Sequence, residues 1–137
     1  MTLPLADAAQ LLRDNFAPWV LDLALGVERT GEREAVLRLP WSDRLAREGG
    51  GLSGQALMAA ADTAVVVAVA SARGGFVPMT TVQQSITFQR PVLGADVLVH
   101  AVLTKVGKRM AFADVRMTAE GDQEPAAHAT AVYALLG

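Results

Sequence analysis

The chain has 137 residues, of which 52% are apolar and 19% are charged, and its formal net charge is −2. This composition excludes a disordered linker, and the near balance of charges argues against the basic face that a nucleic-acid-binding protein needs. The absence of cysteine excludes disulfide scaffolds, thiolate zinc sites and cysteine nucleophiles. The length fits one domain over residues 1–137. With so few charged residues, we expect part of the apolar surface to be covered by a second copy of the chain.

The first part of the chain is predicted to form a helix and then a β-hairpin. Apolar residues recur at helical spacing over residues 5–15. Residues 19–28 and 33–39 are predicted strands, which the Thr-Gly-Glu turn at 30–32 joins as a hairpin. The polar, glycine-rich residues 42–51 are predicted to form a loop. The amino-terminal residues lack Lys, Arg and an unbroken apolar run, so no export signal is expected, and a cytoplasmic location follows as the default.

A long helix is predicted over residues 54–72. The hydroxyl of Ser53 can cap its first amides, and the glycine pair at 74–75 ends it. The helix is apolar on every side, which indicates a helix enclosed by its own protein. It is nearly long enough to span a membrane, but Asp62 lies in its middle, and a central carboxylate costs about 2.5–3.5 kcal/mol in a bilayer. We therefore expect a buried helix of a soluble protein.

Four strands are predicted to follow, and the short turns between them imply antiparallel neighbours. They comprise residues 77–90, 97–105, 110–118 and 126–135. In the first of them, apolar side chains are predicted to face one side of the sheet and polar ones the other. The apolar set is Val82, Ile86 and Phe88, and the polar set is Thr81, Gln83, Ser85 and Thr87. A curved antiparallel sheet needs one face covered, so the predicted architecture is α+β, with the sheet wrapped around one central helix.

Asp62 is the residue that does not fit an apolar helix. Burying a lone carboxylate is costly unless it is paired or hydrogen-bonded, and no Lys or Arg lies within four residues to neutralise it along the helix. Two interpretations are open. Either Asp62 faces solvent at a gap in the sheet or bonds a backbone amide, or it borders a water-containing cleft, where it acts as general base or nucleophile.

The start of the helix is the second candidate feature. The first amides of a helix have no partners inside it and favour a polarised carbonyl or an oxyanion, and Gly54 lets a ligand approach its amide closely. The alternative is that the glycines here merely form a loop and a cap. Gly54 and Asp62 are eight residues apart, about 12 Å along a helix axis. Joint action on one small group therefore requires a dimer that brings Gly54 of one chain beside Asp62 of the other.

Several short motifs together resemble the hotdog-fold acyl-CoA thioesterases, and among them the PaaI-like branch of phenylacetate degradation. They are Gly54, Asp62-Thr63-Ala64, Thr81-Val82, residues 86–91 and residues 105–109. The resemblance implies that the Gly54 amide polarises the thioester carbonyl. It also implies that Asp62 of the facing subunit activates water or attacks directly, and that the Thr81 hydroxyl orients the water.

The chain departs from that family at two places. Ser53-Gly54-Gln55 stands where His-Gly-Gly is usual, and Arg47 stands near the place of a common Asn. The residues expected to bind substrate are Ser53, Gln55, Arg90, Lys108 and Arg109. Arg90 pairs either with the ligand or with a carboxylate of the sheet. Lys108 and Arg109 form either a solvated turn or a contact with the phosphates of CoA.

The leading expectation is an acyl-CoA thioesterase that hydrolyses an aromatic or medium-chain acyl-CoA as a homodimer or a dimer of dimers. No cofactor, nucleic acid or membrane is expected as a partner. His100 and His128 lack a third ligand, so no metal is expected either. The competing expectation is a non-catalytic hotdog protein that holds an acyl-CoA or a small aromatic ligand. Ser53, which stands where the family usually has a histidine, favours this alternative.

Overall fold

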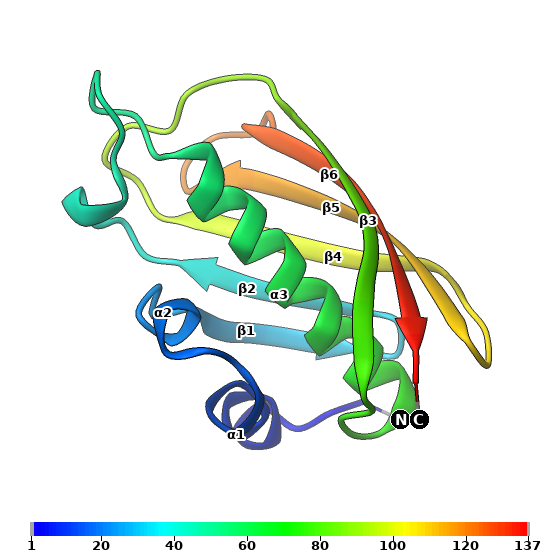
Figure 1. The fold of residues 1–137 in the computed structure, drawn as a ribbon. Coiled ribbons are helices and arrows are strands. Elements are labelled where there is room, and N and C mark those ends of the chain that lie inside the picture. The colour runs from blue at the N-terminus through cyan, green and yellow to red at the C-terminus, as the bar shows by residue number, and fades with distance from the viewer. Residues whose placement is uncertain (1, 137) are drawn as a thin grey trace.

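The computed structural model describes residues 2–136 and has the predicted α+β architecture. Six strands form one sheet, a long helix lies across one face of it, and two shorter helices lie near the amino terminus (Figure 1). In chain order the elements are α1 (Leu5–Asn15), α2 (Pro18–Leu21), β1 (Gly26–Gly31), β2 (Glu34–Leu39), a short 3-10 helix (Asp43–Leu45), α3 (Gly54–Arg73), β3 (Met79–Phe88), β4 (Val97–Val106), β5 (Met110–Ala119) and β6 (Ala127–Leu135).

The sheet is antiparallel and has the strand order β1-β2-β4-β5-β6-β3. Buried and exposed residues alternate along β5 and β6, because one face of the sheet packs against α3 while the other faces outward. The core consists of the inward side chains of the strands and most of α3. The predicted sheet wrapped around a central helix is thus confirmed.

Helix α3 begins and ends close to where the sequence predicts. The Ser53 hydroxyl accepts a hydrogen bond from the Ala56 amide at 3.3 Å, and Gly74 ends the helix in the left-handed region at φ 78°, which glycine adopts without strain. By length and composition this helix could cross a membrane, but 72% of its apolar stretch is buried within the fold. Its hydropathy is therefore that of a core helix.

The predicted strand over residues 19–28 is wrong at its start. Pro18 opens the short helix α2, and β1 begins only at Gly26. Proline suits the first turn of a helix because the amide it lacks would be unpaired there, whereas Trp19 and Val20 are residue types that favour strands. The predicted hairpin is confirmed, because β1 and β2 pair as antiparallel neighbours.

The predicted faces of β3 are wrong in its first half, because the strand contains a β-bulge. Thr81 and Gln83 pair with consecutive residues of β6, so Val82 is an extra residue between them. The extra residue shifts the alternation and places Thr81 on the same face as Ile86, toward α3, while Val82 is 57% exposed. The bulge is therefore what lets the Thr81 hydroxyl reach α3.

The expectation that the first two strands after α3 are neighbours is also wrong. β3 lies at one edge of the sheet beside β6, and β4 lies between β2 and β5. The connection over residues 89–96 therefore passes the amino-terminal end of α3 (Figure 1), where the Leu52 amide donates to the Val92 carbonyl oxygen at 2.9 Å. This crossing places the end of β3 and Arg90 beside the start of α3.

Candidate active site

One stripe of α3 remains partly open to solvent. Its residues are Gln55, Met58, Ala59 and Asp62. Their spacing of three, four and seven residues places them on one side of the helix. With residues of α2 and β3 they line a pocket of about 350 Å³, here called the Asp62 pocket. The other lining residues are Trp19, Thr81 and Gln84.

Two hydroxyl groups hold the carboxylate of Asp62. Thr81 donates from Oγ1 to Oδ1 at 2.7 Å. The hydroxyl of Tyr133 on β6 is shared between the same Oδ1 and the main-chain oxygen of Asp62, the latter at 2.8 Å. Asp62 is thus half-buried and bonded by hydroxyl groups rather than by a backbone amide. Oδ2 receives no hydrogen bond from residues 2–136, so it remains available to water or to a substrate.

Tyr133 is a site residue that the sequence analysis missed. It is 1% exposed. Burial first, and then the negative charge of Asp62, raise the pKa of its hydroxyl, so the hydroxyl stays protonated at neutral pH and can donate. A signal for it exists in the sequence, because the alternation along β6 places this side chain on the inward face. A buried tyrosine hydroxyl usually needs a polar partner, and Asp62 carries the carboxylate of the central helix.

The start of α3 presents amides that can bind a ligand. Within the part of the chain that the structure describes, nothing accepts a hydrogen bond from the amides of Gly54 and Gln55, as expected for a first helical turn. A Cβ on Gly54 would lie 3.0 Å from the ring of Phe88. Gly54 also lines a pocket of about 450 Å³ that includes Arg47 and Arg90, here called the arginine pocket.

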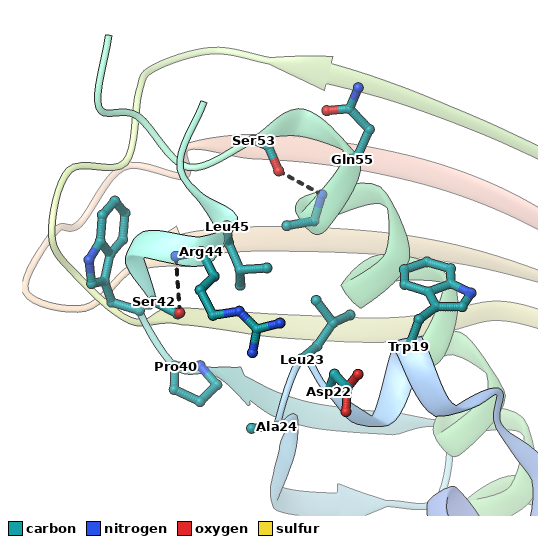
Figure 2. Close-up of a pocket in the computed structure, with 12 residues that line it drawn as sticks. Trp19, Asp22, Leu23, Ala24, Pro40, Ser42, Arg44, Leu45, Ser53 and Gln55 are labelled. Atoms are coloured by element: carbon teal, nitrogen blue, oxygen red, sulfur yellow. Dashed lines mark hydrogen bonds between the residues drawn. The ribbon is translucent and has the colours of Figure 1, made fainter. Parts of the chain in front are cut away.

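Ser53 and Gln55 line a different pocket, of about 470 Å³. Successive helical residues are rotated by about 100°, so Gln55 and Ala56 leave the helix on the side roughly opposite to Gly54 and Leu57. Figure 2 shows the Ser53 hydroxyl turned toward an amide of α3 and the Gln55 amide turned away from Trp19. Ser53 is therefore occupied in capping the helix.

The structure does not bring Lys108 and Arg109 to this region within one chain. They lie in the turn between β4 and β5, where the guanidinium of Arg73 donates to the carbonyl oxygens of Gly107 and Lys108. Arg73 ends α3, nineteen residues after Gly54, which is about 28 Å along the helix. A ligand at the start of α3 could meet these two cations only from another chain.

Gly54 and Asp62 are likewise separated within one helix, by eight residues or about 12 Å. Gly54 offers a hydrogen-bond donor at the start of the helix, and Asp62 offers a carboxylate beside a pocket near the middle of it. These are the parts that hydrolysis of an acyl compound needs. No group of three or more His, Asp and Glu residues that could hold a metal ion occurs among residues 2–136.

The fold is that of a hotdog protein. The family model described as the thioesterase superfamily matches residues 49–126, more than half of the chain, a span that includes Gly54, Asp62 and Thr81. The chain therefore belongs to the thioesterase superfamily. That membership supports a thioester hydrolase in general.

Solved structures of similar proteins share the whole architecture. Zebrafish thioesterase superfamily member 2 is 24% identical, with a TM-score of 0.86 over 98% of this chain and 100% of that chain. The Escherichia coli PaaI protein from the phenylacetic acid degradation operon is 20% identical, with a TM-score of 0.83 over 97% of this chain and 96% of that chain. A mutant of the phenylacetic acid degradation protein PaaI from Thermus thermophilus is 27% identical, with a TM-score of 0.77 over 88% of this chain and 100% of that chain. Among curated proteins, none matches the sequence significantly.

Proposed function

We propose that this protein hydrolyses acyl-CoA thioesters in a site shared between two copies of the chain. The observation that carries the proposal is the state of the Asp62 carboxylate. One of its oxygens is fixed by Thr81 and Tyr133, while the other is left open beside a pocket. A carboxylate that is held in place but not neutralised is suited to act on water or on a carbonyl carbon.

A second copy is part of the proposal because Gly54 and Asp62 of one chain lie too far apart to act on one carbonyl group. Two exposed apolar side chains, Trp19 and Met58, line the Asp62 pocket, and a third, Phe88, lies beside Gly54. Among the described strands, β3 has a neighbour on one side only. An unpaired edge and an exposed apolar surface both favour association, so we infer a homodimer whose two-fold axis lies close to β3.

In the proposed reaction, the thioester oxygen accepts a hydrogen bond from the Gly54 amide, which stabilises the negative charge that develops there. Asp62 of the partner chain then acts by one of two routes. As general base, it takes a proton from water while the water oxygen adds to the carbonyl carbon. The tetrahedral intermediate then breaks its C–S bond, and CoA leaves as a thiolate that takes up that proton. As nucleophile, it adds to that carbon itself, CoA leaves as a thiolate that takes a proton from solvent, and water cleaves the resulting mixed anhydride. Thr81 orients the attacking group in either case.

A rapid-quench experiment separates the two routes. With enzyme in excess over acyl-CoA, the general-base route releases free thiol and free acid together. The nucleophilic route releases thiol before free acid, because the acyl group remains on Asp62 until the anhydride is hydrolysed.

The cationic side chains suggest where the CoA portion lies. Arg47 and Arg90 line the pocket that contains Gly54, and guanidinium groups bind phosphate oxygens well. We assign that pocket to the phosphate-bearing arm of the substrate. Lys108 and Arg109 would contact CoA only in an assembly that brings in their turn from another chain.

The direct test is a free-thiol assay on a panel of aromatic and aliphatic acyl-CoAs with the wild-type chain and Asp62→Asn. Asparagine preserves the size of the side chain but can neither take a proton from water nor attack the carbonyl. We expect turnover to fall about 10²- to 10⁴-fold, while the circular dichroism spectrum and the mass of the assembly stay unchanged. Full activity of the variant on every substrate would exclude this role for Asp62.

The same assay addresses the competing function, a non-catalytic protein that holds an acyl-CoA or a small aromatic ligand. Ser53 supports that alternative, because its hydroxyl caps α3 and cannot replace an imidazole in acid–base chemistry. Binding of acyl-CoA by the wild-type chain without release of thiol would favour it over hydrolysis.

A further inference from the structure

Gln84 on β3 is a polar residue of the Asp62 pocket that the proposed reaction does not yet use. It pairs with Ala131 of β6, just as Thr81 pairs with Tyr133. These two partners are separated by a single residue, so Thr81 and Gln84 occupy successive positions on the face of β3 that is turned toward α3. The bulge in β3 produces this arrangement, because without the extra residue the Gln84 side chain would point outward.

The carboxamide of Gln84 is held by the backbone of α3. Its Nε2 donates to the carbonyl oxygen of Met58 at 3.2 Å. A carbonyl oxygen can only accept a hydrogen bond, so the group facing it is the NH2 group, and Oε1 points away from Met58. Within the part of the chain that the structure describes, no hydrogen bond reaches this Oε1. Its lone pairs are therefore available to a donor in the pocket.

The contacts that Thr81 and Gln84 make with α3 are spaced alike. Met58 precedes Asp62 by four residues, about 6 Å along the helix, and successive inward positions on a strand are about 7 Å apart. Gln84 therefore lies about one helical turn from the Asp62 carboxylate, toward the start of α3. A water molecule that donates its two hydrogens to two oxygens spans about 4 to 5 Å between them. This spacing suits one water that bridges Gln84 Oε1 and the open Oδ2 of Asp62.

A water bound in this way is oriented for attack. Its two hydrogens go to two acceptors, Asp62 Oδ2 and Gln84 Oε1, which leaves the lone pairs of its oxygen free. The Thr81 hydroxyl already donates its hydrogen to Asp62 Oδ1, so it does not compete for those lone pairs. The oxygen of the water can then face a carbonyl carbon placed at the mouth of the pocket.

From these observations we propose that Gln84 is a catalytic residue, whose Oε1 holds the attacking water by the hydrogen that Asp62 does not take. This inference rests on the proposed thioesterase function and deepens it by selecting the general-base route, because a water seated on Oδ2 covers the side of the carboxylate that would otherwise attack.

The proposed step balances as follows for the water held by Asp62 and Gln84. One hydrogen passes to Asp62 while the water oxygen forms a bond to the carbonyl carbon. The C–S bond then breaks, and the CoA thiolate takes up the proton from Asp62. The other hydrogen stays on the new acid, bonded to Gln84, until the acid loses it to solvent.

The first test compares two neighbouring glutamines that point to opposite faces of β3. Gln84→Met keeps most of the side-chain volume but removes the amide. We expect kcat per folded chain for hexanoyl-CoA and phenylacetyl-CoA to fall by about 10- to 100-fold, with little change in KM, because the water rather than the acyl-CoA is misplaced. Gln83→Met is the matched control, since Gln83 is exposed and pairs with Val132, and it should keep the wild-type kcat. An unchanged kcat in Gln84→Met, or a rise in KM alone, would overturn the proposal.

Methanol provides a readout that a purely structural role of Gln84 would not change. It has one hydroxyl hydrogen, which it donates to Asp62, and its methyl group would then meet Gln84 Oε1. In buffer that contains methanol, we expect the ratio of methyl ester to free acid to rise about 2- to 10-fold in Gln84→Met, the effect of one hydrogen bond. The ratio for Gln83→Met should equal that of wild type. A lower kcat with an unchanged ratio in Gln84→Met would show that Gln84 only supports α3, and would overturn the proposal.

Two outcomes separate the failure of this inference from the failure of the proposed function. If wild type releases thiol before free acid in the rapid-quench experiment, Asp62 attacks directly, so the role of Gln84 is overturned and the hydrolase remains. If wild type releases no thiol from any acyl-CoA of the panel, the thioesterase itself is excluded.

Discussion

At the scale of single residues, the fold must compensate for a half-buried carboxylate on a core helix. Such a group is unfavourable unless hydrogen bonds replace its water. The structure supplies two hydroxyl donors to Asp62, one from an exposed residue, Thr81, and one from a buried residue, Tyr133. Because Tyr133 is buried and has its hydroxyl beneath the carboxylate, it positions Asp62 without needing to touch the substrate.

Replacing Tyr133 by Phe should therefore affect the chemical step more than substrate binding. We expect kcat to fall by about 10- to 100-fold, since a small misplacement of a catalytic group has effects of that size, while KM changes little. The unfolding free energy should fall by about 1–3 kcal/mol, because a charged acceptor loses a donor in a half-buried position. Steady-state kinetics and urea unfolding measure the two effects.

The kinetic values for Tyr133→Phe are to be normalised to the folded fraction measured by circular dichroism. If kcat per folded chain equals that of wild type, or if KM alone rises, Tyr133 has only a structural role and the assignment is wrong.

At the scale of elements, the start of α3 allows one amide to be deleted without breaking the helix. Proline is favoured at the first helical position, and Ser53 before it has φ −67° and ψ 145°, a conformation that a following proline accepts. Gly54→Pro removes the N–H proposed to bind the carbonyl oxygen. We expect kcat to fall about 10²- to 10³-fold, the usual effect of losing one such donor.

Gly54→Ala is the matched control for that change. It also places a Cβ about 3.0 Å from the Phe88 ring, but it retains the amide. Phe88 is half-exposed and its side chain can shift, so the alanine variant should keep much more activity than the proline variant. Equal activity of the two variants would show that the amide has no role and that crowding at Phe88 explains any loss.

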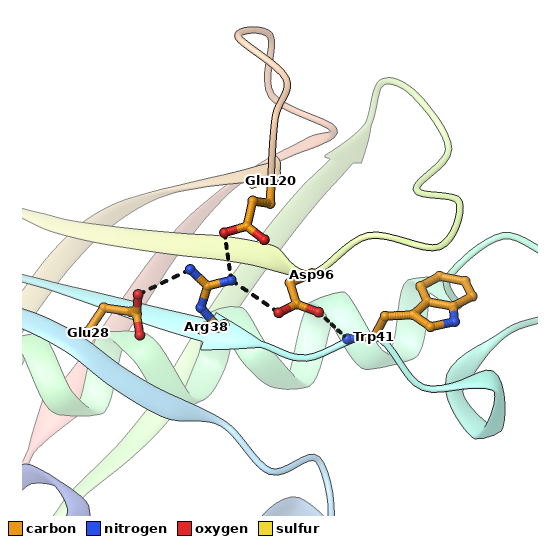
Figure 3. Close-up of polar contacts among 5 residues, drawn as sticks. All are labelled: Glu28, Arg38, Trp41, Asp96 and Glu120. Atoms are coloured by element: carbon orange, nitrogen blue, oxygen red, sulfur yellow. Dashed lines mark hydrogen bonds and ion pairs between the residues drawn. The ribbon is translucent and has the colours of Figure 1, made fainter.

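Asp96 accepts hydrogen bonds from the Trp41 amide at 2.7 Å and from the Arg38 guanidinium at 3.1 Å (Figure 3). These bonds make a prediction about stability and pH. The Trp41 amide first, and the Arg38 guanidinium second, hold the pKa of Asp96 below its usual range. The folded state therefore binds fewer protons than the unfolded state as the pH falls through this region. The stabilisation from Asp96 is complete above about pH 4, the range of an unfolded carboxyl group, and is lost at lower pH.

We expect Asp96→Asn to lower the unfolding free energy at pH 7, and the difference from wild type to narrow progressively below about pH 4. Urea unfolding at several pH values between 7 and 3 measures this difference. Asp114→Asn, at an exposed position on β5, serves as the control for removing one charge. A difference that stays constant over the whole range would contradict the assigned role of Asp96.

The elements with a strong pattern could be predicted from the sequence, and the errors have physical causes. The long helix, its Ser53 cap and its Gly74 end depend on local rules, and β4, β5 and β6 follow from alternation and short turns. The helix at Pro18 was missed because strand-favouring residues follow it. The faces of β3 were wrong because a bulge depends on pairing with β6, which no local pattern reveals.

The candidate site likewise combines residues that local patterns reveal with residues that only the fold brings together. Asp62 and Gly54 stand out in the sequence, as a charge and a glycine in an apolar helix. Tyr133 contacts Asp62 from a position 71 residues away, and nothing in the local sequence distinguishes Trp19, which lines the Asp62 pocket, from a core tryptophan. These two residues are brought to the site by the order of the strands and by helix α2.

At the scale of the whole molecule, the account depends on a site that one chain cannot complete. The open stripe of α3, the unpaired edge of β3 and the exposed apolar residues around them lie together on one part of the monomer. In a dimer related by a two-fold axis, each of two sites would use Gly54 of one chain and Asp62 of the other. Defects placed in different chains should then complement each other.

The decisive measurement is therefore the thioesterase activity of mixed dimers, made by refolding Asp62→Asn and Gly54→Pro chains together in equal amounts. In each mixed dimer one site carries both defects and the other carries none. Random pairing makes half of the dimers mixed, so the account predicts about a quarter of the wild-type activity per chain, far above that of either variant alone. A mixture no more active than the two separate variants, with mixed dimers shown to be present, would contradict a site shared between chains.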